Sequence, residues 1–389
     1  MTAIRPFTLA VPEAQLDDLR ARIDLTRWPD KEPVSDWSQG TPLAALRDLL
    51  AYWRDGYDWR VCEARLNGLG QFVTELDGLD IHFLHIRSPR ADAVPLIMTH
   101  GWPGSVIEFM GVVAGLTNPA DPADPAFHLV LPSLPGYGFS SKPAVTGWGV
   151  EKIARVWGEL MARLGYERWF AQGGDWGSAV TTAIAVQQVP GCAGIHLNMP
   201  IGRPAEEDLI NPTPAELKAL GALKHYQDWD SGYSKQQQTR PQTIGYGLVD
   251  SPAGLAGWIL EKIWAWTDNA GSPWDALSRD QVLDNIMLYW LPGTGASAAR
   301  LYWESFGSFA PQQITLPVAA TAFPREILPT PRRWAERNYR NLIHWGEVER
   351  GGHFAAWEQP EVFLRELRTS FGRMIAGNCI RGESPRYQE

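Results

Sequence analysis

The sequence predicts an α/β protein in which helices cover both faces of a mostly parallel sheet. From residue 94, short apolar runs alternate with stretches of helical periodicity, as in parallel strands joined by crossover helices. The alternation stops near Pro200 and resumes at 315–323, which indicates an inserted segment of a different kind. The 389 residues are 44% hydrophobic and 20% charged, so the chain is globular in composition and long enough for a large core.

The first 88 residues precede this alternation and have their own pattern. Apolar residues at helical spacing predict helices over 12–24 and 42–53. Two strands, 71–76 and 81–86, are expected to pair across the hairpin turn Asp77-Gly78. We therefore treat 1–88 as a separate N-terminal segment.

The alternating region supplies the core elements. The expected strands and helices before the insertion are 95–99, 127–132, 150–164 (helix), 168–172, 177–188 (helix) and 194–198. After it come strands at 315–323 and 341–345 and a helix from Pro360. The intervening residues favour helix, have no clear buried strand, and are interpreted as a lid. The predicted division is 1–88, core 89–200, lid 201–311 and core 312–389, with the last dozen residues loose.

Composition excludes several classes of function. The formal net charge is −9 and no block of Lys or Arg stands out, so nucleic acid and anionic membranes are poor partners. The three cysteines lie far apart without metal-ligand spacing, which argues against disulfides and zinc and for a reducing compartment. The N-terminus lacks an apolar leader, and no run approaches 18 apolar residues. We expect a cytoplasmic protein without a membrane anchor, metal or cofactor.

The most informative residue is Asp175. The run 169–178 reads as strand, sharp turn and helix, and small residues stand two places before and two after Asp175. This is the frame of a nucleophile elbow, in which a crowded turn exposes the central side chain. A serine is usual there. A carboxylate is already ionised at neutral pH and can attack strained or activated sp³ carbon, forming an ester. The pattern therefore favours epoxide opening or dehalogenation over ordinary ester hydrolysis.

Three further motifs complete a candidate site. The loop at 100–105, HGWPGS, follows a strand and is placed to give one backbone N–H of an oxyanion hole, from Trp102, while Trp176 after the nucleophile gives the other. His353, just after the last predicted strand, can reach the elbow as a base. Glu326 follows the preceding strand, where the acid that orients the histidine is expected; Glu347 and Glu349 are rival carboxylates.

Taken together, these motifs resemble those of epoxide hydrolases of the α/β-hydrolase superfamily, of the type typified by microsomal epoxide hydrolase. The matching motifs are HGWPGS at 100–105, GGDWGS at 173–178, FPRE at 323–326 and GGHFAAWEQP at 351–360. The opening segment is similar to the N-terminal region that wraps around the core in that family, and two lid runs match its cap. The resemblance covers nearly all of 1–375. We do not expect the membrane anchor that some members carry.

The resemblance implies two lid tyrosines that hold the epoxide oxygen. Tyr233 and Tyr302 stand where they are expected. The chemistry needs such donors, because ring opening leaves an alkoxide that a phenol can protonate. In the mechanism this implies, Asp175 forms an ester with the substrate. His353, oriented by Glu326, then activates the water that hydrolyses it.

Two rival functions are weighed against this one. A haloalkane dehalogenase would share the Asp nucleophile but needs N–H donors for a halide, for which Trp176 could serve. A non-catalytic ligand-binding protein on the same fold would need neither the triad nor the tyrosines. The substrate is expected to be a small apolar or aryl-bearing epoxide. Detoxification and natural-product biosynthesis both fit, and a homodimer is left open.

Overall fold

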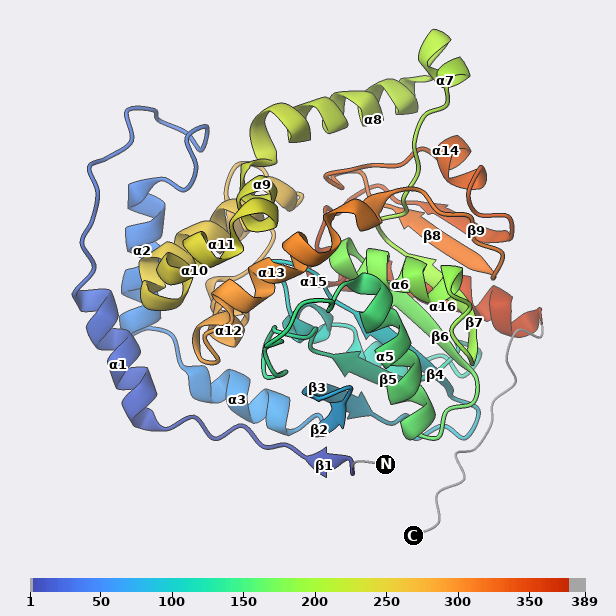
Figure 1. The fold of residues 1–389 in the computed structure, drawn as a ribbon, viewed down its shortest axis with the longest axis horizontal. Helices are drawn as coiled ribbons and strands as arrows, with labels where there is room; N and C mark the ends of the chain where they lie inside the picture. Colours follow the sequence, from blue (N-terminus) through green and yellow to red (C-terminus); the bar gives the residue numbers. More distant parts are fainter. Residues whose placement is uncertain (1–2, 378–389) are drawn as a thin grey trace.

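A single nine-stranded sheet forms the centre of the molecule. The computed structural model describes residues 3–377. The strand order is β1-β2-β3-β5-β4-β6-β7-β8-β9 (Figure 1). The strands are β1 (Arg5–Pro6), β2 (Gln71–Leu76), β3 (Leu79–Ile86), β4 (Val94–Thr99), β5 (Phe127–Pro132), β6 (Trp169–Gly173), β7 (Cys192–Leu197), β8 (Val318–Ala322) and β9 (Leu342–Glu347).

The sheet is antiparallel at one edge and parallel elsewhere. The first three strands pair antiparallel with one another, and β3 pairs antiparallel with β5. From β5 to β9 every pairing is parallel. Strands β4, β5, β6 and β7 are buried along their whole length, as expected of parallel strands covered on both faces. The carboxyl ends of β4, β6 and β8 therefore open toward one edge, where loops can meet.

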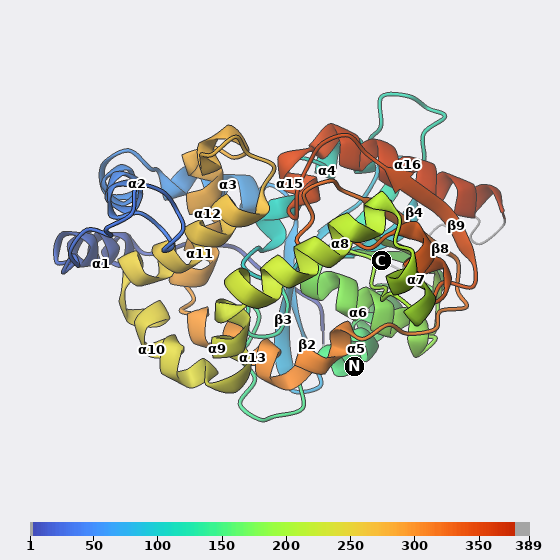
Figure 2. The same ribbon diagram turned by 90° about the horizontal axis from the view of Figure 1, so that it is seen from above.

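Helices cover the two faces of this sheet. Figure 2 shows α5 (Val150–Arg163) and α6 (Asp175–Val186) on one side of the strands, and α4 (Val113–Thr117) and α16 (Pro360–Ala376) on the other. The buried face of α5 contains Ile153, Trp157 and Leu160 at helical spacing. The predicted fold class, a mostly parallel sheet between helices with a helical insertion, is confirmed.

The insertion after β7 consists of helices among its described residues and lies over the carboxyl edge of the sheet (Figure 1). Its α-helices are α7 (Glu206–Ile210), α8 (Pro214–His225), α9 (Gly232–Thr239), α10 (Pro241–Asp250), α11 (Pro252–Trp266), α12 (Arg279–Trp290) and α13 (Gly295–Ser305). A π-helical turn at Tyr226–Asp230 joins α8 to α9, and short 3₁₀ turns lie at Pro273–Asp275 and Phe306–Phe309.

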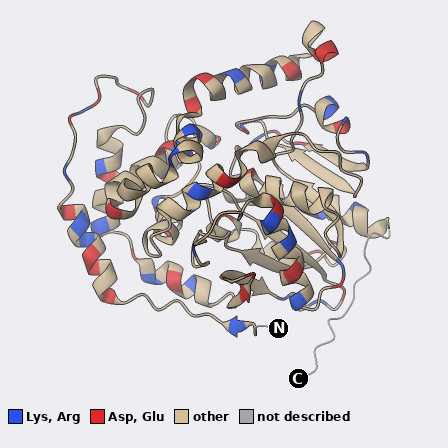
Figure 3. Cartoon of the chain, in the orientation of Figure 1, with Lys and Arg blue, Asp and Glu red and all other residues tan. Residues whose placement is uncertain are grey.

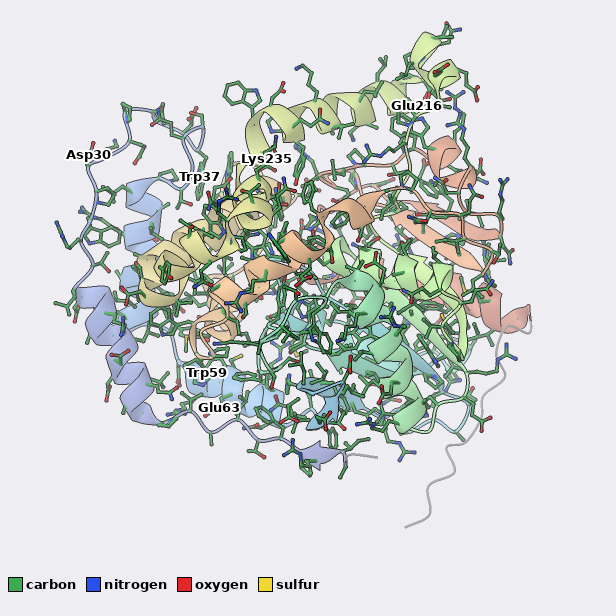
Figure 4. The ribbon with its side chains drawn as sticks, in the orientation of Figure 1. Asp30, Trp37, Trp59, Glu63, Glu216 and Lys235 are labelled. Carbon is green, nitrogen blue, oxygen red and sulfur yellow. The ribbon has the colours of Figure 1, made fainter. Side chains whose placement is uncertain are left out.

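The N-terminal segment packs against the lid as well as the core. Its helices are α1 (Glu13–Asp24), α2 (Leu43–Asp55) and α3 (Trp59–Asn67), of which α1 and α2 contact α11, and α3 contacts α12. The Trp37 ring, labelled in Figure 4, stacks on Trp264 with centroids 5.0 Å apart. The hydroxyl of Tyr57 donates to Asp284 at 2.7 Å.

The helices α7 and α8 form an arm that is tied to the core by ion pairs. Glu216 on α8 (Figure 4) and Asp208 on α7 are fully buried and face Arg333 and Arg337 of the core. These arginines lower the pKa of Asp208 to about 2. Elsewhere, charged residues of both signs mix along the outer helices, and the sheet is almost free of them (Figure 3).

Most expected elements are found at or within a few residues of their predicted bounds. The turn at Asp77-Gly78 joins β2 and β3 as predicted, with φ of 49° and 82°. The elbow helix begins at Asp175, two residues earlier than expected, and α3 and α4 were not predicted at all. Within residues 3–377, no helix is long and apolar enough to cross a membrane. The division into four parts stays a prediction, and the expected looseness of the last dozen residues concerns 378–389, outside the described residues.

Candidate active site

Asp175 lies at the tip of the turn between β6 and α6. Its φ of 50° is in the left-handed region, where a residue with a side chain is strained. The turn needs small neighbours, because a side chain on Gly177 would overlap the backbone of Thr99. The Asp175 side chain is buried from bulk solvent and projects from the carboxyl edge of the sheet. This is the geometry that the elbow pattern predicts.

The loop after β4 lies against the Asp175 carboxylate. The backbone N–H of Trp102 donates to its Oδ1 at 2.7 Å. A side chain on Gly101 would overlap the carboxylate, so the close approach requires glycine. The amide of Trp176, in the first turn of α6, remains the predicted second donor. Oδ1 of Asp175 thus accepts the Trp102 amide, whereas Oδ2 faces His353.

Lid helix α12 fixes this same loop. The Asn285 side chain donates to the carbonyl of Pro103 at 2.8 Å. The Tyr289 hydroxyl donates to the carbonyl of Gly104 at 2.7 Å. Both side chains are buried, so these bonds are formed away from competing water. The lid therefore positions part of the core site.

His353 lies between Asp175 and Glu326. Its Nε2 is 3.4 Å from Oδ2 of Asp175, and its Nδ1 is 2.7 Å from Oε1 of Glu326. The loops that carry Glu326 and His353 pair directly, through a bridge between Arg325 and Gly352. Burial alone would lower the pKa of His353, but the two carboxylates outweigh it and raise that pKa well above its usual value. The two carboxylates therefore favour the charged form of the imidazole.

The His353 loop is braced from both sides. The carboxylate of Glu358 accepts hydrogen bonds from the backbone N–H groups of Gly352 and Phe354, at 3.1 and 3.0 Å. The backbone N–H of His353 donates to the carbonyl of Trp266 on the lid, at 2.9 Å. The ring of Trp266 also packs against the imidazole, with centroids 5.0 Å apart. Trp266 therefore lies directly beside the candidate base.

Two lid tyrosines face the core residues. Tyr233 on α9 stacks on Trp102, with centroids 4.9 Å apart and planes within 9°. Tyr302 on α13 packs edge-on against the same indole, at 5.9 Å. The two phenol rings are 5.7 Å apart. Trp102, whose amide donates to Asp175, thus also orients both tyrosines through its ring.

The hydroxyls of the two tyrosines have different partners. The Tyr233 oxygen lies 3.3 Å from that of Tyr226, a residue that sequence reasoning missed. The buried Tyr302 hydroxyl has no hydrogen-bond partner among the described residues, and neither does the indole N–H of Trp176. Burial, with Asp175 adding to it, raises the pKa of both Tyr233 and Tyr302 well above 10. Both phenols therefore keep their protons at neutral pH.

A buried ion pair supports Tyr233 from within the lid. The ammonium of Lys262 is 2.6 Å from Asp230 and lies 4.7 Å from the centroid of the Tyr233 ring. The indole N–H of Trp266 donates to the same aspartate at 2.7 Å. The cation thus contacts both the aspartate and the phenol ring. No residue spacing in the sequence revealed this pair.

Seven predicted site residues thus meet at one edge of the sheet: Trp102, Asp175, Trp176, Tyr233, Tyr302, Glu326 and His353. The rival carboxylates Glu347 and Glu349 are exposed, whereas Glu326 is buried against His353. No group of three His, Cys, Asp or Glu side chains within residues 3–377 could hold a metal ion.

Comparison with known proteins gives this geometry its context. The family model described as epoxide hydrolase N terminus matches residues 4–109, and the model described as alpha/beta hydrolase fold matches 94–244. The chain is 36% identical to epoxide hydrolase 1 of Sus scrofa over 407 residues, which cover 95% of this chain and 89% of that one. The chain belongs to the epoxide hydrolase family. A protein of Stigmatella aurantiaca with the same family assignment is 54% identical over 96% of this chain and 86% of its own.

Solved structures of epoxide hydrolases agree with this placement. The juvenile hormone epoxide hydrolase of the silkworm Bombyx mori superimposes with a TM-score of 0.90 at 32% identity, over 97% of this chain and 96% of that one. The Aspergillus niger epoxide hydrolase gives 0.85 at 34% identity, over 96% of both. The α/β-hydrolase fold and the enzyme class predicted from the motifs are both confirmed.

Proposed function

We propose that this enzyme hydrolyses an epoxide to a vicinal diol through a covalent ester on Asp175. The observation that carries the proposal is the relay of contacts from Glu326 through His353 to Asp175, with two protonated phenols opposite. A carboxylate aimed into an apolar site needs no activation before it attacks carbon. The phenols supply the proton that the opening ring requires.

In the first step, an Asp175 oxygen attacks one epoxide carbon from the rear. The C–O bond of the ring breaks, and Tyr233 or Tyr302 gives its proton to the departing oxygen. The two rings pack on one indole with centroids 5.7 Å apart, so in this proposal either phenol serves the same epoxide oxygen. The product is a hydroxyalkyl ester and a tyrosinate.

In the second step, His353 removes a proton from a water molecule, whose oxygen attacks the carbonyl carbon of the ester. Esterification has removed the negative charge of Asp175, one of the two carboxylates that keep His353 protonated. The imidazole can then give its proton to solvent and act as a base. The amides of Trp102 and Trp176 hold the oxyanion, and each such donor is typically worth about 3 kcal/mol of barrier.

The substrate we propose is an apolar or aryl-bearing epoxide. The residues around the reacting groups are largely aromatic: Trp102, Trp176, Tyr226, Tyr233, Trp266 and Tyr302. Such walls bind apolar groups and leave few polar contacts for a charged substrate. A cytoplasmic location, a homodimer and either biological role stay predictions.

A single-turnover experiment in oxygen-18 water tests the ester mechanism. With enzyme in excess over styrene oxide, the first diol should be mainly unlabelled, because its new oxygen comes from Asp175. The label should appear in the peptide that carries Asp175 and enter the diol in later turnovers. A fully labelled diol in the first turnover would instead mean direct attack by water, with Asp175 as a general base.

Haloalkane dehalogenation is kept as a second candidate because of one observation. The buried indole N–H of Trp176 has no partner among the described residues and could donate to a halide. Halide release from a panel of haloalkanes, measured beside diol formation, separates the two activities. We expect diol formation without halide release, because two phenols are better suited to an alkoxide than to a halide.

A further inference from the structure

A small cavity lies on the core side of Asp175. It has a volume of about 20 Å³, enough for about one water molecule. Asp175 and His353 line it, together with Glu108, and the other lining residues are Thr99, Gly101, Trp102, Phe109, Gly174, Asn198, Phe354, Ala355, Ala356 and Phe363. These residues all come from the core or the loops at its edge. Tyr233 and Tyr302 do not line it, so the cavity and the phenols approach Asp175 from different directions.

Glu108 brings a third ionisable group to this cavity. It lies on the 3₁₀ turn Val106–Phe109, directly after the loop that holds Trp102, and this turn packs against α15 (Ala355–Glu358) beside His353. The carboxyl group folds back over Gly104, where any side chain would overlap it. Glu108 retains some accessible surface although it lies deep in the protein, as expected of a side chain that faces an internal cavity.

The Glu108 carboxyl group accepts a hydrogen bond from the backbone N–H of Ser105, which caps the turn, and it faces the cavity. Within residues 3–377, no lysine or arginine forms an ion pair with it. Burial raises the pKa of Glu108 to about 8. His353 acts against the rise, whereas the negative charges of Asp175 and Glu358 add to it. A perturbed carboxyl group beside a candidate base and nucleophile is typical of a functional site.

We propose that Glu108 is a further catalytic residue, which holds the hydrolytic water in this cavity together with His353. The inference rests on the ester mechanism proposed above and concerns its second step alone. One O–H of the water points to Nε2 of His353, and the other points to a carboxyl oxygen of Glu108. A water held at two points presents its oxygen to the carbonyl carbon of the Asp175 ester.

Hydrolysis of the ester proceeds through a tetrahedral intermediate. The water oxygen forms a bond to the ester carbon, and His353 takes one proton from the water. When the tetrahedral intermediate collapses, the ester C–O bond breaks and the diol oxygen leaves with the proton from His353. The second water proton remains on the Asp175 carboxyl group and passes through Glu108 to solvent. The tyrosinate left by ring opening takes a proton back from solvent.

The variant Glu108→Gln tests the proposal by rapid quench and intact-protein mass spectrometry with styrene oxide. We expect alkylation of Asp175 to stay within about threefold of wild type and decay of the ester to slow about 100-fold, within the usual range for such groups. The ester should accumulate, and kcat and KM should fall together so that kcat/KM is almost unchanged. The matched control is Glu366→Gln. Glu366 is a buried glutamate on α16 that contacts His344, and its replacement should leave both steps unchanged.

Two results would overturn the proposal: an unchanged rate of ester decay, or an equal slowing of both steps, which would mean a structural role. If Glu108→Gln does not fold, Glu108→Asp keeps the charge but withdraws it from the cavity, and it should slow decay at least about tenfold with normal alkylation. Wild-type enzyme that forms neither ester nor diol would contradict the proposed function itself. A normal wild-type ester with normal decay in the variants would contradict only the role of Glu108.

Discussion

The core and the lid supply different kinds of group to the site and hold them by different means. The core residues Asp175, Glu326 and His353 are ionisable, and hydrogen bonds between short loops at the ends of strands fix them. The lid residues Tyr233 and Tyr302 are neutral and are held mainly by ring packing. In the mechanism we propose, the core therefore forms and hydrolyses the ester, whereas the lid protonates the leaving oxygen.

Burial favours the neutral form of the side chain in both sets, but the outcomes differ. It would make His353 neutral, but two carboxylates overcome it and raise the pKa of the imidazole. In the lid nothing overcomes it, and the pKa of both Tyr233 and Tyr302 stays far above neutral. In the mechanism we propose, the core therefore changes its charge when Asp175 is esterified, and the lid keeps its protons until an alkoxide forms.

The largest effect is expected from the core base. Replacing His353 with Gln removes the base of the second step but leaves Asp175 free to attack. Turnover should fall at least about 10⁴-fold, by analogy with the loss of an essential triad group. Intact-protein mass spectrometry should find an adduct of substrate mass that maps to Asp175. An adduct on another residue, or none, would contradict the assignment of the nucleophile.

The lid tyrosines should affect the other step. Tyr233→Phe and Tyr302→Phe should each slow alkylation about 10- to 1000-fold, and the double variant should nearly abolish it. The fold should persist because only hydroxyl groups are lost, which circular dichroism can check. A near-normal pre-steady-state rate of alkylation in the double variant would mean that the lid tyrosines do not donate the proton, and it would favour dehalogenase chemistry.

The proposed change of charge in the core can be measured directly. Asp175→Asn mimics the neutral ester, so it should lower the pKa of His353 toward its ordinary value by removing one of the two carboxylates that raise it. Titration of the histidine ring by NMR, wild type against variant, measures this shift. Since the folded-state pKa is raised, the charged imidazole adds stability below pH about 6.5, and this is lost as pH rises through the folded value. Equal His353 titrations in the two proteins would mean that the carboxylates are not coupled to it.

The same contrast explains what the sequence could predict. The residues of the core site were predicted one by one. The elbow, the oxyanion loop, the acid and the histidine each follow a strand of one parallel sheet, and the carboxyl ends of such strands lie at the same edge. The short helix α3 was missed, since its nine residues are too few for a clear periodic pattern.

Lid contacts were harder to predict because they depend on how helices pack. Tyr233 and Tyr302 came only from family resemblance, not from spacing. Lys262 and Glu108 lie beside residues far away in sequence, and Tyr226 reaches Tyr233 across a π-helical turn. No local pattern marks such contacts. The N-terminal segment was predicted to be separate, but its attachment to the lid through Trp37 and Tyr57 appears only in three dimensions.

The smallest effect concerns this attachment, which should stabilise the lid without taking part in the chemistry. Tyr57 donates to Asp284 in a partly buried contact at 2.7 Å, and Tyr52 donates to Asp280 at the same distance in an exposed one. Burial raises the pKa of Asp284 to about 6, so this side chain is charged at pH 7.5 and largely protonated at pH 5. Tyr57→Phe should therefore lower the free energy of unfolding by about 1.5–3 kcal/mol at pH 7.5, where a buried charge loses its donor, and by about 1 kcal/mol at pH 5.

The free energy of unfolding is measured by denaturant titration at both pH values for wild type and variant, and kcat is measured at 25 °C. The sign follows from the raised pKa of Asp284: the folded state binds the proton more tightly, so stability from this group falls as pH rises from about 4 to about 6, and the Tyr57 bond offsets part of that loss. Tyr52→Phe is the matched control and should cost less than about 1 kcal/mol at either pH, because water replaces its bond. The kcat of both variants should stay within about twofold of wild type, because α12 and the tyrosine helices keep their packing on the core. A large loss of kcat in Tyr57→Phe would mean that the N-terminal segment sets the position of the catalytic tyrosines, and the distinction between a chemical core and an independently held lid would no longer stand.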